Sequence, residues 1–313
     1  MTRSPARSQR EDRGTTTAAM ARPAAACRRR DGPGGALYVT EGAVGRISGV
    51  DPKTGDLTTF ASGLPRSIVG IGGAIDVAFT GATAYVLVTL VGSDVGGRDV
   101  VGIYRVDGPD SFTVVADIGA FSMTHLPPYP VDVPTGVQYA LETYRGGFLV
   151  TDGHHNRVLR VTRDGEVTEF GVFDNIVPTG LAVSGKTVYM AEAGPVPHEP
   201  EDGKVVSFGT KSPTVTEIAS GAPLLVDVEF GRGRSLYALS QGVFGGGSAG
   251  APALPNTGGL VRVNGNGTFT VVADGVDRPT SLEFIGNTAY VVTLGGEIWR
   301  FDSVSDPPSG RSR

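Results

Sequence analysis

The feature that most constrains the fold is a short strand-like segment that recurs six times along the chain. Each copy places one aromatic residue among small or aliphatic ones, and these aromatic residues are Tyr38, Tyr85, Phe148, Tyr189, Tyr237 and Tyr290. Successive aromatic residues lie 47, 63, 41, 48 and 53 positions apart. Four short strands and their turns need roughly 40–50 residues. The spacing therefore predicts six copies of one four-stranded unit.

The other strands of each unit follow a common order. An apolar inner strand precedes the aromatic strand, a third strand ends in an Arg-Val-like pair such as Arg160-Val161, and a fourth strand closes the unit. The predicted inner strands span residues 74–79, 134–139, 178–183, 225–230 and 279–284. Asp164-Gly165 and Asn264-Gly265 supply the positive φ of tight hairpin turns, so consecutive strands are predicted to pair antiparallel.

Radial closure is the arrangement that six such sheets favour, because a single four-stranded sheet leaves two faces and two edges uncovered. We predict an all-β chain: a six-bladed β-propeller of four-stranded antiparallel blades, similar to NHL and SMP-30 propellers. The last unit has only three strands and ends near Phe301, and the first copy lacks an inner strand, so closure at the N-terminus is predicted to be imperfect. We expect the propeller over residues 35–303, with residues 1–34 disordered or mis-assigned and residues 304–313 as a disordered tail.

Composition limits the class of protein. The net charge of −5 provides no broad cationic surface, so nucleic acid is not an expected partner. The one cysteine, Cys27, excludes an internal disulfide framework, and no apolar run approaches the ~18 residues of a membrane span. Residues 1–30 contain eight arginines and no continuous apolar segment, so they do not form a credible signal peptide. Oligomeric state has no indicator in the sequence.

Acidic residues at two levels of the predicted channel are candidate metal ligands. Aligning the inner strands places Asp76, Gly136, Gly180, Asp227 and Ser281 at one level, with the two aspartates on opposite blades. These two carboxylates could hold Ca²⁺ or Mg²⁺. The alternative, which we favour, is that each aspartate accepts backbone N–H groups from the neighbouring inner strand.

A second level lies where the aromatic strands end. It comprises Glu41, Val88, Thr151, Glu192, Ser240 and Thr293, with the two glutamates again on opposite blades. The glutamates resemble the acidic metal ligands of gluconolactonase-like propellers. Together with Asp76 and Asp227 they define one functional hypothesis, a metal-dependent lactonase or ester hydrolase.

Three long connections, residues 121–133, 194–203 and 242–258, are candidate binding loops, because propellers use long loops on one face for recognition. Phe121, His125, Tyr129 and Phe244 are predicted either to form an apolar ligand-binding rim or to pack over the propeller face. The adjacent His154 and His155 would point apart on a strand, and we expect the histidines at surface turns.

The aligned repeats resemble the NHL-like propeller family named for ScyD and ScyE of scytonemin gene clusters. The resemblance spans residues 32 to 301 and rests on G-P-G-G-A-L-Y-V-T-E at 32–41, V-P-T-G-L-A-V at 177–183 and P-T-S-L-E-F at 279–284. It implies an exported, actinobacterial type of protein without a defined reaction. We predict a non-catalytic propeller that binds a small molecule or a protein at one face, with the metal-dependent hydrolase as the alternative.

Overall fold

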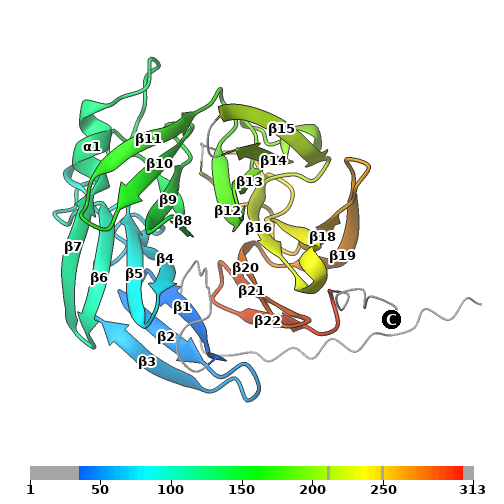
Figure 1. Cartoon of the computed structure of the whole chain (residues 1–313), viewed down its shortest axis with the longest axis horizontal. Coiled ribbons are helices and arrows are strands. Elements are labelled where there is room, and N and C mark those ends of the chain that lie inside the picture. Colours follow the sequence, from blue (N-terminus) through cyan, green and yellow to red (C-terminus); the bar gives the residue numbers. More distant parts are fainter. Residues whose placement is uncertain (1–34, 210–211, 248–249, 306–313) are drawn as a thin grey trace, which may run out of the picture.

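Six antiparallel sheets stand as blades around a common axis in the computed structural model of the chain (Figure 1). The structure describes residues 35–209, 212–247 and 250–305. Inner strands of consecutive blades lie side by side from the first blade to the sixth. The chain is thus a six-bladed β-propeller, as the repeat predicts. The predictions for residues 1–34 and 306–313 fall outside the described residues.

The strands follow one another in simple up-and-down order within each blade. Blade 1 contains β1 (Leu37–Glu41), β2 (Arg46–Val50) and β3 (Leu57–Ser62). Blade 2 contains β4 (Gly73–Thr80), β5 (Thr83–Thr89), β6 (Gly102–Gly108) and β7 (Ser111–Asp117). Blade 3 contains β8 (Gln138–Tyr144), β9 (Gly147–Asp152), β10 (Arg157–Thr162) and β11 (Val167–Val172). Blade 4 contains β12 (Pro178–Ser184), β13 (Thr187–Glu192), β14 (Lys204–Gly209) and β15 (Ser212–Ser220). Blade 5 contains β16 (Leu225–Phe230), β17 (Leu236–Ser240), β18 (Gly258–Val263) and β19 (Phe269–Val276). Blade 6 contains β20 (Pro279–Ile285), β21 (Thr288–Thr293) and β22 (Ile298–Phe301).

In the part of the chain that the structure describes, helical structure is confined to the connections. The α-helix α1 (Ile118–Thr124) joins blades 2 and 3 at the rim of the ring (Figure 1). Three single 3₁₀ turns, η2 (Ser93–Val95), η3 (Pro200–Asp202) and η4 (Arg232–Arg234), lie in other connections. Within the described ranges, no helix has the length and apolar character to cross a bilayer.

The hydrophobic core is divided into six layers, one between each pair of neighbouring blades. Side chains alternate along a strand, so adjacent residues enter different layers. On β5, Tyr85 packs toward blade 3 whereas Val86 packs toward blade 1. Both faces of each blade are therefore buried, which explains why the middle strands read as continuous apolar runs.

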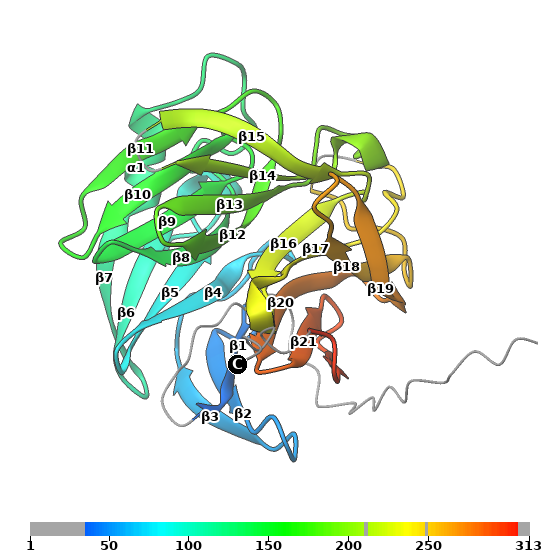
Figure 2. The same cartoon turned by 45° about the vertical axis from the view of Figure 1, so that its right-hand side comes forward.

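The ring closes between blade 6 and blade 1, which Figures 1 and 2 both show next to each other. Leu37 and Val39 of β1 pack against Tyr290 and Val292 of β21. This layer holds six buried apolar side chains among the described residues, against nine to thirteen in the other five layers. Within residues 35–305, blades 1 and 6 have three strands each, whereas the other blades have four. The predicted contribution of residues before Gly35 to ring closure lies outside the described residues.

Side chains link the inner strands, because neighbouring blades do not share a hydrogen-bond ladder. Asp76 on β4 accepts the Leu141 backbone N–H of blade 3 at 2.6 Å. Asp227 on β16 accepts the Leu282 N–H of blade 6 at 2.9 Å. Thr179 donates its hydroxyl to the Leu225 carbonyl of blade 5 at 2.8 Å. The inner wall is thus held together blade to blade by single polar side chains.

The inner strand of blade 3 lies four residues later than predicted. The prediction equated Pro134-Thr135-Gly136 with Pro178-Thr179-Gly180, but β8 begins at Gln138, and Gln138 and Pro178 both pair with the last residue of the following strand. Ala140, not Gly136, therefore lies at the level of Asp76 and Asp227. Residues 134–137 belong instead to the long connection from α1, where Gly136 adopts a φ of 79°.

Residues 304 and 305, which follow β22, pack against blade 5. Ser305 is buried and accepts the Arg232 backbone N–H at 2.9 Å, and the Val304 carbonyl accepts the Tyr237 hydroxyl at 3.1 Å. These contacts anchor residues 304 and 305 to blade 5.

We expect Asp227→Ala to lower the free energy of unfolding by about 2–4 kcal/mol, because it removes the acceptor of two buried backbone N–H groups, those of Val228 and Leu282. Urea denaturation measures this loss. Asp274→Ala, at an exposed position of β19 in the same blade, should change stability by less than about 0.5 kcal/mol. Equal small effects of both substitutions would contradict a structural role for Asp227.

Candidate functional site

A cavity of about 230 Å³ occupies one mouth of the central channel. It lies where the inner strands begin and the second strands end, and blades 2 to 6 all contribute side chains to it. Convergence of five blades on one concave space is typical of a propeller ligand site. The cavity is therefore the leading candidate functional site.

Apolar side chains make up most of the cavity wall. The larger ones are Ile71, Ile75, Leu90, Val137, Tyr139, Val177, Val196, Leu224, Val226 and Leu294. The polar ones are Thr89, Gln138, His154, Thr179, His198, Gln241 and Thr280. No Asp, Glu, Lys or Arg belongs to the lining formed by the described residues. Such a wall favours an uncharged guest, because an ion buried without a partner is strongly disfavoured.

Tyr139 crosses the channel beneath the cavity. Its ring leaves β8 of blade 3, packs with apolar residues of blades 5 and 6, and its hydroxyl donates to the Thr280 carbonyl of blade 6 at 2.7 Å. Blades 3 and 6 lie on opposite sides of a six-membered ring, so this side chain crosses the channel. Tyr139 therefore forms part of the floor of the cavity.

Four polar residues of the wall bind neighbouring protein groups. The Thr89 hydroxyl donates to Gln138 Oε1 at 2.7 Å, and Gln138 Nε2 donates to the Thr135 carbonyl at 3.0 Å. The hydroxyls of Thr179 and Thr280 donate to backbone carbonyls within 3.1 Å. These groups stabilise the wall and leave its surface largely apolar.

His198 and Gln241 approach the cavity from the connections of blades 4 and 5. His198 is 6% exposed, and its Nδ1 lies 2.7 Å from the Gly194 carbonyl and 3.1 Å from that of Ala193. A carbonyl only accepts, so Nδ1 carries the proton and donates. Gln241 Oε1 accepts the Ala253 N–H at 3.0 Å. This hydrogen bond identifies the oxygen of the side-chain amide, so the amide nitrogen of Gln241 is the atom that points away from Ala253.

His154 is the third polar residue of the cavity wall that comes from a connection, besides His198 and Gln241. Burial lowers its pKa, although the nearby carboxylates of Asp152 and Asp132 act in the opposite direction. The ring is thus neutral at pH 7. His155 points away from the cavity toward Arg157, so the two adjacent histidines diverge, although they lie in the turn after β9 and not on a strand as the prediction assumed.

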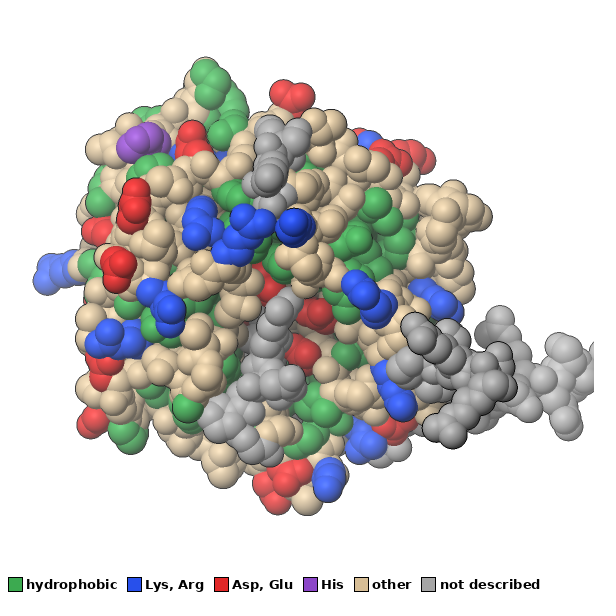
Figure 3. All heavy atoms as spheres, viewed as in Figure 1, with side chains coloured by type: hydrophobic (Ala, Val, Ile, Leu, Met, Phe, Trp, Pro, Cys, Tyr) green, Lys and Arg blue, Asp and Glu red, His purple; other side chains and the backbone are tan. Residues whose placement is uncertain are grey.

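The predicted channel aspartates lie in the inner wall and not in the cavity lining. Asp76 and Asp227 each accept the N–H of the following residue as well as one from the next blade, which matches the favoured structural alternative. The inner strands also carry Glu142, Glu229 and Glu283, and they contain no Lys or Arg. Acidic side chains gather around the middle of the face shown in Figure 3.

The two predicted glutamates occupy equivalent positions with different partners. Glu41 receives a two-pronged contact from Arg46, at 2.8 and 2.6 Å, and a hydrogen bond from Ser48. Glu192 is 4% exposed and faces Lys204 across the strands, but Lys204 forms its ion pair with Glu217 at 3.0 Å. Burial raises the pKa of Glu192 to about 7. Neither glutamate lines the cavity.

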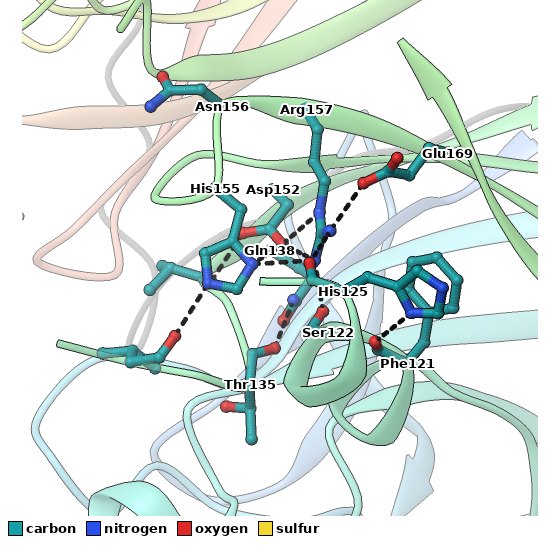
Figure 4. Close-up of polar contacts among 12 residues, drawn as sticks. Phe121, Ser122, His125, Thr135, Gln138, Asp152, His155, Asn156, Arg157 and Glu169 are labelled. Atoms are coloured by element: carbon teal, nitrogen blue, oxygen red, sulfur yellow. Dashed lines mark hydrogen bonds and ion pairs between the residues drawn. The ribbon is translucent and has the colours of Figure 1, made fainter. Parts of the chain in front are cut away.

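Asp152 is the acidic residue of blade 3 at the position of Glu41 and Glu192, and the sequence reasoning missed it. A buried arginine, Arg157, binds its carboxylate. Asp152, the last residue of β9, faces Arg157, the first residue of β10, at 3.3 Å (Figure 4). Arg157 also donates to the His125 carbonyl at 2.7 Å and the Ser122 hydroxyl at 2.9 Å. These bonds fix α1 and the connection after it to blade 3.

His155 completes the arginine cluster. Its Nδ1 lies 2.9 Å from the Arg157 guanidinium, and its Nε2 lies 3.2 Å from the Val133 carbonyl. The same Nδ1 lies 3.2 Å from the Asp152 carboxylate. The cluster has a structural role beside the cavity.

The predicted apolar rim is divided between two places, and none of its four residues lines the cavity. Phe121 and His125 stack with ring centroids 4.0 Å apart above Arg157, and Tyr129 accepts a hydrogen bond from Asn156. Phe244 instead packs edge to face on His198, with centroids 5.1 Å apart. Phe244 thus packs directly on a residue of the cavity wall.

Sequence reasoning did not identify the polar side of the cavity. It expected the histidines at surface turns, whereas His155 and His198 are buried and His154 lines the cavity. It also placed Thr151 where the strand pairing puts Asp152. The one available signal was positional: His154 and Gln241 both follow the end of a second strand.

Among the described residues, no group of three or more His, Cys, Asp or Glu side chains has an arrangement suited to a metal ion. Asp76 and Asp227 bind backbone N–H groups of two different blade pairs, and Glu41 binds Arg46. The four predicted ligands are thus not gathered into one donor set.

Comparison with known proteins supports the fold alone. No family model matches the sequence, and no curated protein matches it. Solved structures with the same fold include the nidogen/laminin complex, at 13% identity and a TM-score of 0.58 over 86% of this chain and 89% of that one. A gluconolactonase from Xanthomonas campestris matches at 14% identity and 0.58 over 85% and 81%. The PQQ-bound aldose sugar dehydrogenase of Streptomyces coelicolor matches at 15% identity and 0.61 over 91% and 96%. The propeller neighbours thus include a protein-binding complex and enzymes.

We expect the stability of the protein to fall as pH rises through the window from about 4.5 to 7, because Glu192 is protonated there in the folded state and ionised in the unfolded state. The contribution is about 3 kcal/mol at most. Glu192→Gln should remove this loss, so the variant should gain stability relative to the parent between pH 5 and pH 8. Urea unfolding at both pH values measures it.

Glu166→Gln, at an exposed turn of blade 3, provides the control and should keep the parental pH dependence. An unchanged slope in Glu192→Gln would show that another group carries it.

Proposed function

We propose that this propeller is a binding protein that takes a small, uncharged and largely apolar molecule into the cavity at the mouth of its channel. The observation that carries the proposal is the cavity wall, which combines aliphatic side chains with uncharged polar groups above the Tyr139 floor. Burial of apolar surface supplies affinity at about 25 cal/mol per Å² before association costs. The lack of charge in the described lining supplies selectivity against ions.

A metal-dependent lactonase or ester hydrolase is the alternative. It has weaker support, because Asp76, Asp227 and Glu41 accept hydrogen bonds from protein groups and none of them lines the cavity. The gluconolactonase neighbour shares the fold at an identity too low to transfer its activity. If a divalent cation did bind, Ca²⁺ or Mg²⁺ would be the expected ion for a carboxylate set.

A protein partner at the same face is the second binding mode. The connections on this side expose large apolar side chains, among them Ile68, Val69, Leu126 and Val243. Exposed apolar groups of this kind favour a macromolecular contact around the cavity.

We also infer membership of the ScyD/ScyE-type propellers. The motifs at residues 32–41, 177–183 and 279–284 support this inference, together with the six-bladed fold. The inference is compatible with a binding role and assigns no reaction.

We expect a neutral bicyclic aromatic such as naphthalene to bind and to raise the melting temperature, because it can fill the cavity and does not bind the unfolded chain there. Ala251→Phe, which places a large side chain in the cavity lining, should abolish binding. Ala82→Phe, in the exposed turn between β4 and β5 at the other end of the blade, should not. Calorimetric titration measures each dissociation constant.

Metal analysis and a panel of lactones and aryl esters test the alternative on the same protein. We expect neither a tightly held metal nor turnover. Stoichiometric metal and a turnover that Asp227→Ala removes, in a variant that remains folded, would favour the hydrolase.

A further inference from the structure

Three polar residues of the cavity wall keep a hydrogen-bonding atom that no described protein group engages, and they come from neighbouring blades. His154, His198 and Gln241 all come from the ends of second strands in blades 3, 4 and 5 or from the connections that follow. Ile71, Ile75, Leu90 and Leu294 line it from the segments of blades 2 and 6. A guest would therefore be oriented, with one polar edge toward blades 3 to 5.

His198 presents an acceptor to this space. Its Nδ1–H is held by the carbonyls of Ala193 and Gly194, so Nε2 carries the lone pair. The hydrogen bonds of His198 within the described chain all involve Nδ1. An Nε2 acceptor at the cavity wall can receive a hydrogen bond from a guest that brings an N–H or O–H group.

Gln241 presents a donor. Its Oε1 is engaged by the Ala253 N–H, which leaves the amide nitrogen to interact with a guest, and no protein acceptor within the described ranges binds it. His154 adds a neutral ring, which offers one donor and one acceptor. The polar edge is therefore complementary to a molecule that has both kinds of group.

The size of the cavity limits the guest further. A protein cavity of about 150 Å³ holds benzene, so about 230 Å³ corresponds to a molecule of roughly ten non-hydrogen atoms. We propose that the cavity selects uncharged one- or two-ring compounds that carry a hydrogen-bond donor and an acceptor on one edge, as in cyclic aromatic amides and hydroxyaryl carbonyls. The proposal rests on the proposed function and specifies the chemical class that the binding site recognises.

Four probes of similar size test the proposal: 2-quinolinone, which has both groups, N-methyl-2-quinolinone, which has only the acceptor, naphthalene, which has neither, and 2-naphthoate, which is an anion. We expect 2-quinolinone to bind about tenfold more tightly than its N-methyl derivative or naphthalene, and 2-naphthoate not to bind. Calorimetry on the full chain gives the dissociation constants.

Each of two variants removes the atom that would bind the guest from one residue. Each retains that residue's hydrogen bond to the protein. His198→Asn can keep a donor to the Gly194 carbonyl, and Asn is favoured over most residues at the φ of 59° found there. It should abolish the preference for 2-quinolinone over the N-methyl compound and leave naphthalene affinity unchanged. Gln241→Glu can keep the acceptor for Ala253 N–H and should weaken both quinolinones.

The outcomes separate the two proposals. Equal affinity for 2-quinolinone and naphthalene would overturn the donor–acceptor rule and leave the apolar binding function intact. A preference that survives both substitutions would overturn the roles of His198 and Gln241. Failure of every probe to bind the parent protein would overturn both the rule and the proposed function.

Discussion

Mutual burial of the sheets is the constraint on which the rest of the molecule depends. Each blade covers one face of the blade before it and one face of the blade after it, so no sheet has a solvent side. Six such layers require a ring, and a ring makes five inner strands converge with their N-terminal ends at one mouth. The cavity, its five-blade lining and its polarity are consequences of that geometry.

The closing layer and the inner wall show where this constraint is weakest. Blades 1 and 6 bury fewer apolar side chains between them than any other pair in the described chain. Around the axis, where strands of different blades meet without a shared ladder, single side chains such as Asp76, Asp227 and Thr179 take over the linking role. Acidic residues near the axis can thus be explained by backbone N–H groups that lack strand partners.

The fold was predictable from the sequence because its signals are local and repeated. Six aromatic strands at similar spacing define the blades, and the Asp-Gly and Asn-Gly turns define their antiparallel order. Register was harder: Pro134-Thr135-Gly136 imitates Pro178-Thr179-Gly180, yet the strand starts at Gln138 because the connection from α1 uses the earlier residues.

The cavity could not be predicted in the same way. Its polar side depends on the paths of three connections that have no repeat to align. Whether a histidine in such a loop faces solvent or a cavity is decided by contacts such as Nδ1 of His198 with its own loop carbonyls. Residue type alone does not carry that information, and the predicted rim of Phe121, His125 and Tyr129 belongs to the Arg157 cluster for the same reason.

The tyrosine that spans the channel also ties two distant blades together. Its hydroxyl joins blade 3 to blade 6, which are not neighbours in the ring, and its ring packs against the core layer of blades 5 and 6. The floor of the cavity is thus a contact across the axis, and a change in the spacing of these two blades would change the shape of the space above it.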